Sequence, residues 1–259
     1  MRYALVLVAL LASLTACGAN HPATATASQP PTPTPTTAPT PTGSPAPTSG
    51  AVPSGPAASS ASPSKSASPA GPPMLRPDAS GPEVLALQRR LSDLGYWLGT
   101  PDSRYGSSTE HAVTAFQKVA GLGRDGVAGP ATMSALDRAT RPRPRAGSGN
   151  AIEVDLARQV VLLVVAGRTE WVLDASTGRV AGTTPTGRYG IFRQVDGYDP
   201  GPLGVLYRPK YFTGGVAVHG FPDVPPYAAS HGCVRVTNAA MDWLWATGRT
   251  PIGRPVWVY

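Results

Sequence analysis

One cysteine and one histidine near the C-terminus have the residue types of a nucleophile and its base. Cys233 lies in the stretch YAASHGCVRVTN, among polar residues that favour turns. His219 ends the apolar run GGVAVHG, and the end of a strand can present a side chain rigidly toward a neighbouring loop. A thiol attacks as its thiolate, which requires a nearby base or a positive field. The pair therefore predicts nucleophilic catalysis, against the alternative of a buried cysteine and hydrogen-bonded histidines in a β core.

The residues around this pair suggest supporting roles. Gly232 permits a tight turn, in which its backbone amide and that of Cys233 can face a developing oxyanion. His231 is two residues from Cys233 and can shape the loop, but a neighbour this close is often poorly placed as a base. His111 falls in the middle of an expected helix, on the side away from its apolar stripe, so we expect it to be a surface residue.

The only other cysteine, Cys17, ends a stretch with the layout of a secretory signal. MRYALVLVALLASLTAC has a basic residue, a short apolar run and then small residues. The run is too short for a transmembrane helix, which needs ~20 apolar residues. The segment Leu14–Cys17 resembles the bacterial lipobox, whose cysteine is lipidated and becomes the mature N-terminus; an ordinary signal peptide is the alternative. Lipidation of Cys17 would leave Cys233 unpaired in an exported protein, which indicates intermolecular pairing or a reactive nucleophile.

Composition divides the rest of the chain. Residues 18–77 are rich in Pro, Thr, Ser and Ala, cannot bury enough apolar surface to fold, and are expected to form a disordered tether. The net charge of +7 is modest, and no run of basic residues interleaved with aromatics suggests nucleic-acid binding. A basic exported protein can be attracted to anionic wall polymers or lipid headgroups, although solvated charges are as good an explanation.

Residues 78–140 are expected to form three short amphipathic helices with one small core. Ser107 and Glu110 have the spacing of a capping box for the second helix, and the third begins near Pro130. The expected inward-facing residues are Val84, Leu87, Leu91, Leu94, Val113, Phe116, Val119, Ala120, Met133 and Leu136. The stretch RPRPRAGSGN, residues 141–150, is then expected to be a linker with solvated arginines, a contact with a wall polymer being the alternative.

The order of residues in the helical region resembles the peptidoglycan-binding domain of many bacterial wall enzymes. The matching features are Leu87-Gln88, Leu94-Gly95-Tyr96, Tyr105-Gly106, Ala112-Val113, Phe116-Gln117 and Asp125-Gly126. The turn at Asp102-Ser103-Arg104 differs from the tighter Asp-Gly turn that is usual in the family. The resemblance implies that this domain binds peptidoglycan.

Residues 151–259 have the pattern of a β-rich domain with one helix. The expected strands lie in AIEVDLA, QVVLLVVAG, RTEWVLDAS, RYGIFRQ, GVLYRP, GGVAVHG and PVWVY. The helix is expected over 238–247, capped by Thr237 or Asn238 and followed by Gly248, with Met241, Leu244 and Trp245 buried. The predicted fold class is therefore α+β, as a three-helix domain followed by a β-rich domain.

The C-terminal domain resembles the L,D-transpeptidase catalytic domain. Ser230-His231-Gly232-Cys233-Val234-Arg235, preceded by Val218-His219-Gly220, is similar to that family's active-site signature, and residues 176–192 to its Ser-Thr-Gly…Thr-Pro-Thr-Gly segment. The interval between His219 and Cys233 is shorter than in many members. The resemblance implies Cys233 as nucleophile, His219 as base, Gly220 as the carbonyl that orients the base, and an oxyanion hole at Gly232 and Cys233. It further implies a donor site lined by Ser230, His231 and Arg235, with a structural role for Arg235 as the alternative, and with no metal or organic cofactor.

The reaction that the resemblance implies is acyl transfer on peptidoglycan stem peptides. Cys233 would attack a tetrapeptide stem, release D-alanine, and pass the acyl group to a neighbouring stem as a 3→3 crosslink. Hydrolysis of the same acyl-enzyme, as in an L,D-carboxypeptidase, and a non-catalytic wall-binding lipoprotein are the alternatives. Sortases and Cys/His endopeptidases fit less well, because their cysteine, histidine and arginine differ in spacing or order. The expected location is the outer face of the membrane, through lipid on Cys17, with peptidoglycan stem peptides and glycan as partners.

Overall fold

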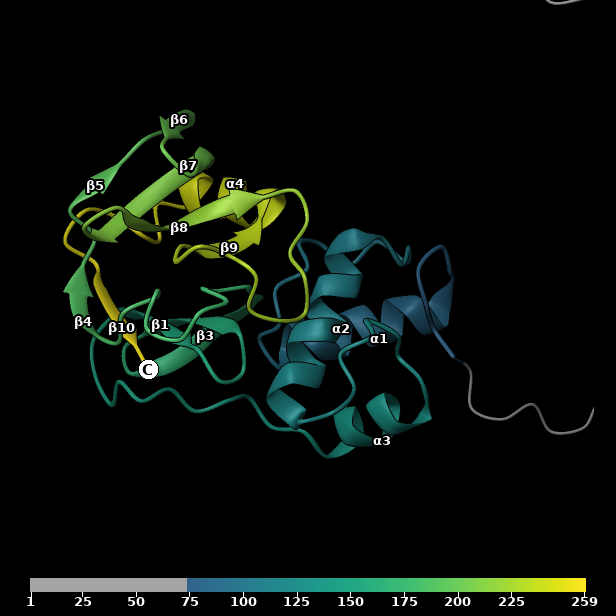
Figure 1. The fold of residues 1–259 in the computed structure, drawn as a ribbon. Coiled ribbons are helices and arrows are strands. Elements are labelled where there is room, and N and C mark those ends of the chain that lie inside the picture. Colours follow the sequence, from purple (N-terminus) through teal and green to yellow (C-terminus); the bar gives the residue numbers. More distant parts are fainter. Residues whose placement is uncertain (1–73) are drawn as a thin grey trace, which may run out of the picture. The chain divides into compact units, whose positions relative to one another are not determined.

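The computed structural model describes residues 74–259, all of which lie within one compact unit (Figure 1). The predicted signal peptide, its Cys17 and the tether up to residue 73 lie outside the described residues. Among the described residues, pairing is seen from Leu75 onward, whose backbone exchanges two hydrogen bonds with Ala128 at 3.2 and 2.8 Å. The described part of the fold thus includes a residue that lies before the predicted boundary at residue 78.

Three helices form the N-terminal part, as the sequence predicts: α1 (Pro82–Asp93), α2 (Ser107–Ala120) and α3 (Pro130–Arg138). Pro82 and Pro130 stand in the first turn, where a missing N–H costs nothing. The inward-facing residues of the first helix are all buried, as are Val113, Phe116 and Leu136. Val119 and Met133 are only partly buried, and Ala120 is exposed.

The predicted capping box is wrong. Gly106 is the N-cap of α2, and its carbonyl accepts from the Glu110 amide at 3.0 Å. Ser107 is the first residue of the helix and therefore lies one position after the N-cap, where its side chain cannot serve as the cap. No side chain caps this helix.

Two sheets make up the C-terminal part (Figure 1). The first has the order β3-β2-β1-β10-β4, with β1 (Ala151–Asp155), β2 (Val160–Val165), β3 (Arg168–Asp174), β4 (Gly187–Gly190) and β10 (Pro255–Val258). The second has the order β5-β7-β8-β9, with β5 (Arg193–Gln194), β7 (Gly204–Thr213), β8 (Val216–Phe221) and β9 (Val234–Thr237); β6 (Tyr198–Gly201) pairs with β7. Strands β6 and β9 were not among the predicted strands.

One helix, α4 (Asn238–Ala246), packs on the second sheet. Thr237 caps it by accepting from the Ala240 amide at 3.1 Å, and Met241 and Leu244 are buried, as predicted. Trp245, which was predicted to be buried, is only partly buried, and the Lys210 ammonium lies 3.7 Å from the centroid of its ring.

The helical and β-rich parts are joined by a buried ion pair that the sequence did not reveal. Lys118 of α2 donates to Asp174 Oδ1 at 2.6 Å and to the backbone oxygens of Gln159 and Ala175. His111 lies 2.7 Å from the other oxygen of Asp174, so its prediction as a plain surface residue is wrong. The reason is that the face of α2 opposite its own core packs against the end of β3.

The arginines of the predicted linker are not simply solvated either. Arg141 donates to the backbone oxygens of Asp93, Thr169 and Glu170. The guanidinium of Arg145 lies 3.5 Å from the centroid of the Tyr259 ring. This segment is therefore bound to both parts of the chain.

Candidate active site

Two adjacent parallel strands bring the predicted nucleophile and base to one face of the second sheet. In the pairing of β8 with β9, Val218 is opposite Val234 and His219 is opposite Arg235. Cys233 directly precedes Val234, and side chains alternate along a strand, so Cys233 projects to the same face as Arg235 and His219. Val218 and Val234 project to the other face and are buried in the core.

His219 is held as a neutral, oriented imidazole. Its Nδ1 lies 2.8 Å from the Gly220 carbonyl oxygen, which can only accept, so Nδ1 carries the proton and Nε2 is left with a lone pair. The residue is 2% exposed, and this burial, reinforced by the charge of Arg235, lowers the pKa of His219 to about 4 although the Gly220 carbonyl opposes the shift. At neutral pH the side chain is ready to accept a proton.

Gly220 can be no other residue in this arrangement. A Cβ here would lie 2.6 Å from Cδ1 of Tyr207 and 2.7 Å from Oδ1 of Asn238. The carbonyl that orients His219 is thus fixed by close packing of β7 and α4 around the strand.

Cys233 is partly buried and has the only free thiol among the described residues. Its Sγ lies 3.8 Å from the Gly215 carbonyl oxygen. Burial raises the pKa of the Cys233 thiol, while a backbone hydrogen bond from Ala217 and the charge of Arg235 partly oppose that shift. The resting pair is therefore a protonated thiol and a neutral imidazole.

The loop before Cys233 is tied down by hydroxyl groups. Ser230 Oγ donates to the Cys233 carbonyl at 2.6 Å and accepts from the Gly232 amide at 3.0 Å. Thr184 Oγ1 donates to the Gly232 carbonyl at 2.7 Å. Gly232 has φ 148°, and a Cβ there would lie 2.6 Å from the Thr183 oxygen, so only glycine fits.

These contacts change two of the predicted roles. Ser230 is 1% exposed and its hydroxyl is used inside the loop, so it supports the loop rather than lining a substrate surface. The Gly232 amide, predicted for the oxyanion hole, points at Ser230 Oγ in this structure. It becomes available to an oxyanion only if that hydrogen bond is given up.

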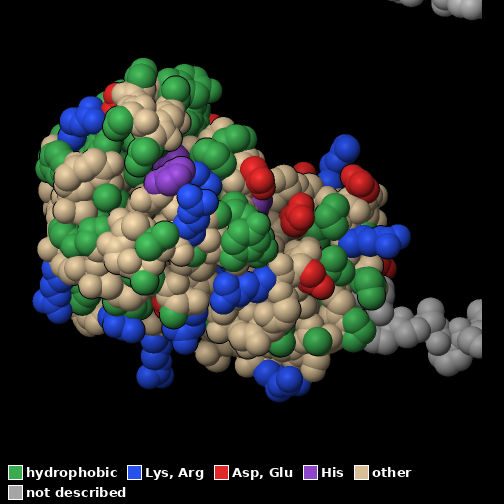
Figure 2. Space-filling model, in the orientation of Figure 1, with side chains coloured by type: hydrophobic (Ala, Val, Ile, Leu, Met, Phe, Trp, Pro, Cys, Tyr) green, Lys and Arg blue, Asp and Glu red, His purple; other side chains and the backbone are tan. Residues whose placement is uncertain are grey.

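His231 and Arg235 remain accessible beside the thiol. His231 is exposed, and Figure 2 shows a histidine side chain beside a Lys or Arg side chain at the surface of the molecule. The Arg235 guanidinium lies 4.0 Å from the centroid of the Phe221 ring. Within residues 74–259, the buried Nε of Arg235 has no hydrogen-bond partner.

The structure adds supporting residues that the sequence did not single out. Ser176 exchanges backbone hydrogen bonds with Arg235 at 3.0 and 2.8 Å, and the Thr177 carbonyl accepts from the amides of Ala229 and Ser230. The Ser-Thr-Gly segment therefore lies alongside the Cys233 loop and holds it through backbone hydrogen bonds on both sides of Cys233. The resemblance marked these residues as a motif but did not say what they hold.

Tyr211 is a second addition. It pairs with Ala217 across β7 and β8, and its hydroxyl donates to Asp199 at 2.7 Å. Burial, followed by this hydrogen bond, raises the pKa of Tyr211 to about 12. Because Asp199 lies on β6, a strand that was not predicted, no pattern in the sequence connects the two residues.

Two further observations concern the described residues alone. No group of three or more His, Cys, Asp or Glu side chains in 74–259 is arranged to hold a metal ion. Among the helices of this part of the chain, none is both long and apolar enough to cross a membrane.

The fold and site define a class of bacterial wall enzyme, in which a helical peptidoglycan-binding region precedes a β-rich catalytic domain. Residues 80–136 match the family described as a putative peptidoglycan binding domain, and residues 149–258 match the L,D-transpeptidase catalytic domain. The crystal structure of an L,D-transpeptidase from Xylanimonas cellulosilytica is 48% identical, with a TM-score of 0.71 over 74% of this chain and 100% of that one. The chain belongs to the L,D-transpeptidase family.

Curated relatives match over shorter stretches. The N-acetylmuramoyl-L-alanine amidase CwlM of Mycobacterium tuberculosis is 41% identical over 56 residues, which are 22% of this chain and 14% of the relative. The amidase CwlL of Bacillus licheniformis is 46% identical over 65 residues, 24% of this chain and 18% of the relative. The chain therefore spans less than a fifth of the length of either amidase.

Proposed function

We propose that this protein is a cell-wall L,D-transpeptidase that forms 3→3 crosslinks through a thioester on Cys233. The observation that supports this most directly is the strand register, which puts Cys233 and a neutral, oriented His219 on one face of β8 and β9. Membership of the L,D-transpeptidase family gives the reaction type.

The first half-reaction forms the acyl-enzyme. As Sγ of Cys233 attacks the carbonyl at the L-centre of diaminopimelate in a tetrapeptide stem, Nε2 of His219 takes the thiol proton. The C–N bond to the terminal D-alanine then breaks, and His219 returns the proton to the leaving amine. The raised pKa of the thiol and the neutral state of the imidazole favour this coupled transfer over a preformed ion pair.

The second half-reaction transfers the acyl group. The side-chain amine of a neighbouring stem attacks the thioester, His219 accepts the proton that the amine loses, and the Cys233 thiol is regenerated as the new amide forms. The developing oxyanion is stabilised by the Cys233 amide, together with that of Gly232 once Ser230 releases it. Attack by water instead of an amine would give an L,D-carboxypeptidase.

Arg235 and His231 are proposed to hold the donor stem. The positive charge of Arg235 and its position near the thiol fit a substrate carboxylate, since guanidinium and carboxylate form paired hydrogen bonds. Exposed His231 stands next to the nucleophile along the chain. We further propose export, with lipid on Cys17 as the membrane anchor and residues 18–73 as the tether.

The decisive experiment uses disaccharide-tetrapeptide with the full chain and with Cys233→Ala, followed by mass spectrometry. A crosslinked dimer and free D-alanine are expected, both absent with the variant. Clean conversion to tripeptide would replace transpeptidation by hydrolysis. No product that depends on Cys233, from folded protein, would contradict the enzyme and favour a wall-binding lipoprotein.

A further inference from the structure

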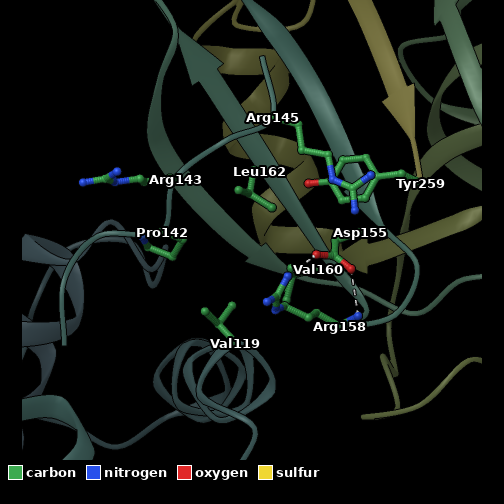
Figure 3. A pocket seen from close by; sticks show the side chains of 9 residues that line it. All are labelled: Val119, Pro142, Arg143, Arg145, Asp155, Arg158, Val160, Leu162 and Tyr259. Carbon is green, nitrogen blue, oxygen red and sulfur yellow. Dashed lines mark hydrogen bonds and ion pairs between the residues drawn. The ribbon is translucent and has the colours of Figure 1, made fainter. Parts of the chain in front are cut away.

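The turn between β1 and β2 contains a buried residue, Gln159, that the proposed mechanism does not use. Figure 3 shows Asp155 and Val160, the residues on either side of this turn, at a cavity that Val119 of α2 also lines. Gln159 is the last residue of the turn and is 4% exposed. Its φ is 61°, and it is the only buried residue among the non-glycine residues of 74–259 that have a positive φ. Because glycine adopts this conformation at little cost, the turn itself does not explain why a glutamine side chain stands here.

The side chain of Gln159 bonds mainly to Thr177, in the middle of the Ser-Thr-Gly segment. Its Oε1 accepts from the Thr177 amide at 2.8 Å, and its Nε2 donates to Thr177 Oγ1 at 2.7 Å. One further bond stays within the turn, from Nε2 to the Leu156 carbonyl at 2.6 Å. Thr177 is 1% exposed, so water does not compete for these bonds. One amide group therefore fixes both the main chain and the side chain of Thr177.

The backbone of Gln159 is itself held from three directions. Its amide donates to the Asp155 carbonyl at 2.8 Å, inside the turn. Its carbonyl accepts from the Ala175 amide at 3.2 Å and from the ammonium of Lys118 on α2, also at 3.2 Å. The side chain of Gln159 thus starts from a fixed backbone, which leaves it little freedom to move away from Thr177.

Thr177 in turn holds the loop that carries the nucleophile. Its carbonyl accepts from the amides of Ala229 and Ser230 at 3.0 and 2.9 Å. The Ser230 hydroxyl then bonds to the Gly232 amide and the Cys233 carbonyl. The position of Thr177 therefore affects where the amides of Gly232 and Cys233 lie relative to Sγ, and these amides are the proposed donors to the oxyanion.

We propose that Gln159 is a positioning residue for acyl transfer, which acts through Thr177 on the amides that stabilise the oxyanion. This inference rests on the proposed function, which supplies acyl transfer at Cys233 as the reaction. Such donors contribute most as charge develops on the carbonyl oxygen of the substrate. A displaced loop should therefore slow attack on a carbonyl more than it slows other reactions of the same thiol.

The test compares two reactions of Cys233, in the full chain and in its variant Gln159→Gly. With p-nitrophenyl acetate, Sγ bonds to the acetyl carbon through an oxyanion, the bond to p-nitrophenolate breaks, and the thiol proton passes through His219 to solvent. With iodoacetamide, Sγ displaces iodide from a CH₂ carbon, and no oxyanion forms. Exposure and pKa of the thiol affect both reactions, so the ratio of the two rates reports on the oxyanion donors.

Gln159→Gly should lower the ratio of acylation to alkylation roughly tenfold or more, since small displacements of catalytic groups cost up to about a hundredfold. Glycine keeps the positive φ of the turn, so circular dichroism should show a retained fold. Thr177→Val loses only the bond to Nε2 and should have a smaller effect. With tetrapeptide, Gln159→Gly should lower kcat for D-alanine release and leave KM nearly unchanged, because the oxyanion exists only in the transition state and intermediate.

Asn150→Ala is the matched control. The side-chain oxygen of Asn150 accepts from the Ala166 amide at 3.0 Å in the next turn of the same sheet, where Ala166 has φ 49°. The ratio should not change in this variant. An unchanged ratio in Gln159→Gly, or an equal fall in Asn150→Ala, would overturn the inference. A chain that released no D-alanine, although Gln159→Gly still lowered the ratio, would contradict the proposed function and leave this inference standing.

Discussion

The protonation state of His219 follows from its surroundings rather than from its residue type. An ordinary histidine has a pKa near 6.5, whereas burial lowers that of His219 to about 4. Between about pH 4 and pH 6.5, the His219 imidazole is therefore neutral and can act as a base, whereas an exposed histidine is already largely protonated. The Gly220 carbonyl decides which nitrogen does so.

We predict that kcat/KM for D-alanine release keeps its value down to about pH 5 and is halved only near pH 4. The sign follows from the lowered pKa, because the base is lost only when pH falls through the folded-state value. His231→Asn should leave this acid limb unchanged. Half-activity near pH 6.5 would contradict the assignment of His219.

Folding must be followed in the same pH series. In the unfolded chain His219 becomes protonated below about pH 6.5, whereas in the folded chain it stays neutral until about pH 4. The free energy of unfolding therefore decreases as the pH falls from the first value to the second. Circular dichroism at each pH separates loss of the base from loss of the fold.

At the scale of elements, the Cys233 loop depends on a neighbouring segment more than on its own sequence. Thr184 is 3% exposed, donates to the Gly232 carbonyl at 2.7 Å and accepts from the Gly178 amide at 2.9 Å. One hydroxyl thus joins the Ser-Thr-Gly segment to the turn that carries the nucleophile.

Thr184→Val should lower the free energy of unfolding by about 1–3 kcal/mol, because two buried backbone groups lose their partner. It should also speed alkylation of Cys233 by iodoacetamide, measured by mass spectrometry, because a looser turn exposes the thiol that burial keeps protonated. Thr183→Val is the matched control, since its hydroxyl bonds only to the Val180 oxygen at 2.7 Å. Equal effects of the two variants would show that Thr184 does not support the turn.

The pattern of apolar and polar residues correctly predicted the helices and strands that are long enough to show their own period. The stripe of α1 and the apolar runs of β1, β2 and β3 are long enough to reveal period and boundaries. Strand β9 is only VRVT, and it is a strand because β8 and Ser176 bond to it on either side. Strand β6 contains Asp, Pro and Gly, which disfavour a strand, and forms through its pairing with β7.

The same distinction holds within the candidate site. Cys233 and His219 were predicted from residue type and position, because a thiol and an imidazole limit the chemistry. The buried Ser230 hydroxyl and the Tyr211–Asp199 pair were not, since each depends on contacts between segments far apart in sequence. The role of His111 was misjudged because its partner Asp174 belongs to the other part of the chain.

At the scale of the whole molecule, a buried lysine is one of the contacts between its two parts, in addition to a shared apolar cluster and the backbone pairing of Tyr96 with Val172. The side chain of Lys118 is fully buried, and its three hydrogen bonds go to Asp174, Gln159 and Ala175. Burial lowers the pKa of Lys118, an effect that the Asp174 carboxylate opposes. Ala175 adjoins the Ser176 strand pairing described above, so the helices contact the segment that supports Cys233.

Lys118→Met should therefore lower the free energy of unfolding by about 3–5 kcal/mol, because it removes the ammonium partner of the buried Asp174 carboxylate and leaves it only His111. The double variant Lys118→Met/Asp174→Asn should lose less than the sum of the single variants, as expected for a coupled pair. Denaturant unfolding measures both. Arg138→Gln, whose partner is the exposed Ser134, serves as control, and additive losses would show that the pair is not coupled.

The raised pKa of Cys233 also bears on how long the molecule survives where it is proposed to work. Thiolates attack peroxides and disulfides far faster than thiols do, so a cysteine that stays protonated between turnovers is oxidised slowly. Residues 74–259 contain no second cysteine that could reverse such damage by forming an internal disulfide. The burial that makes the resting thiol a poor nucleophile is thus also its protection against irreversible oxidation.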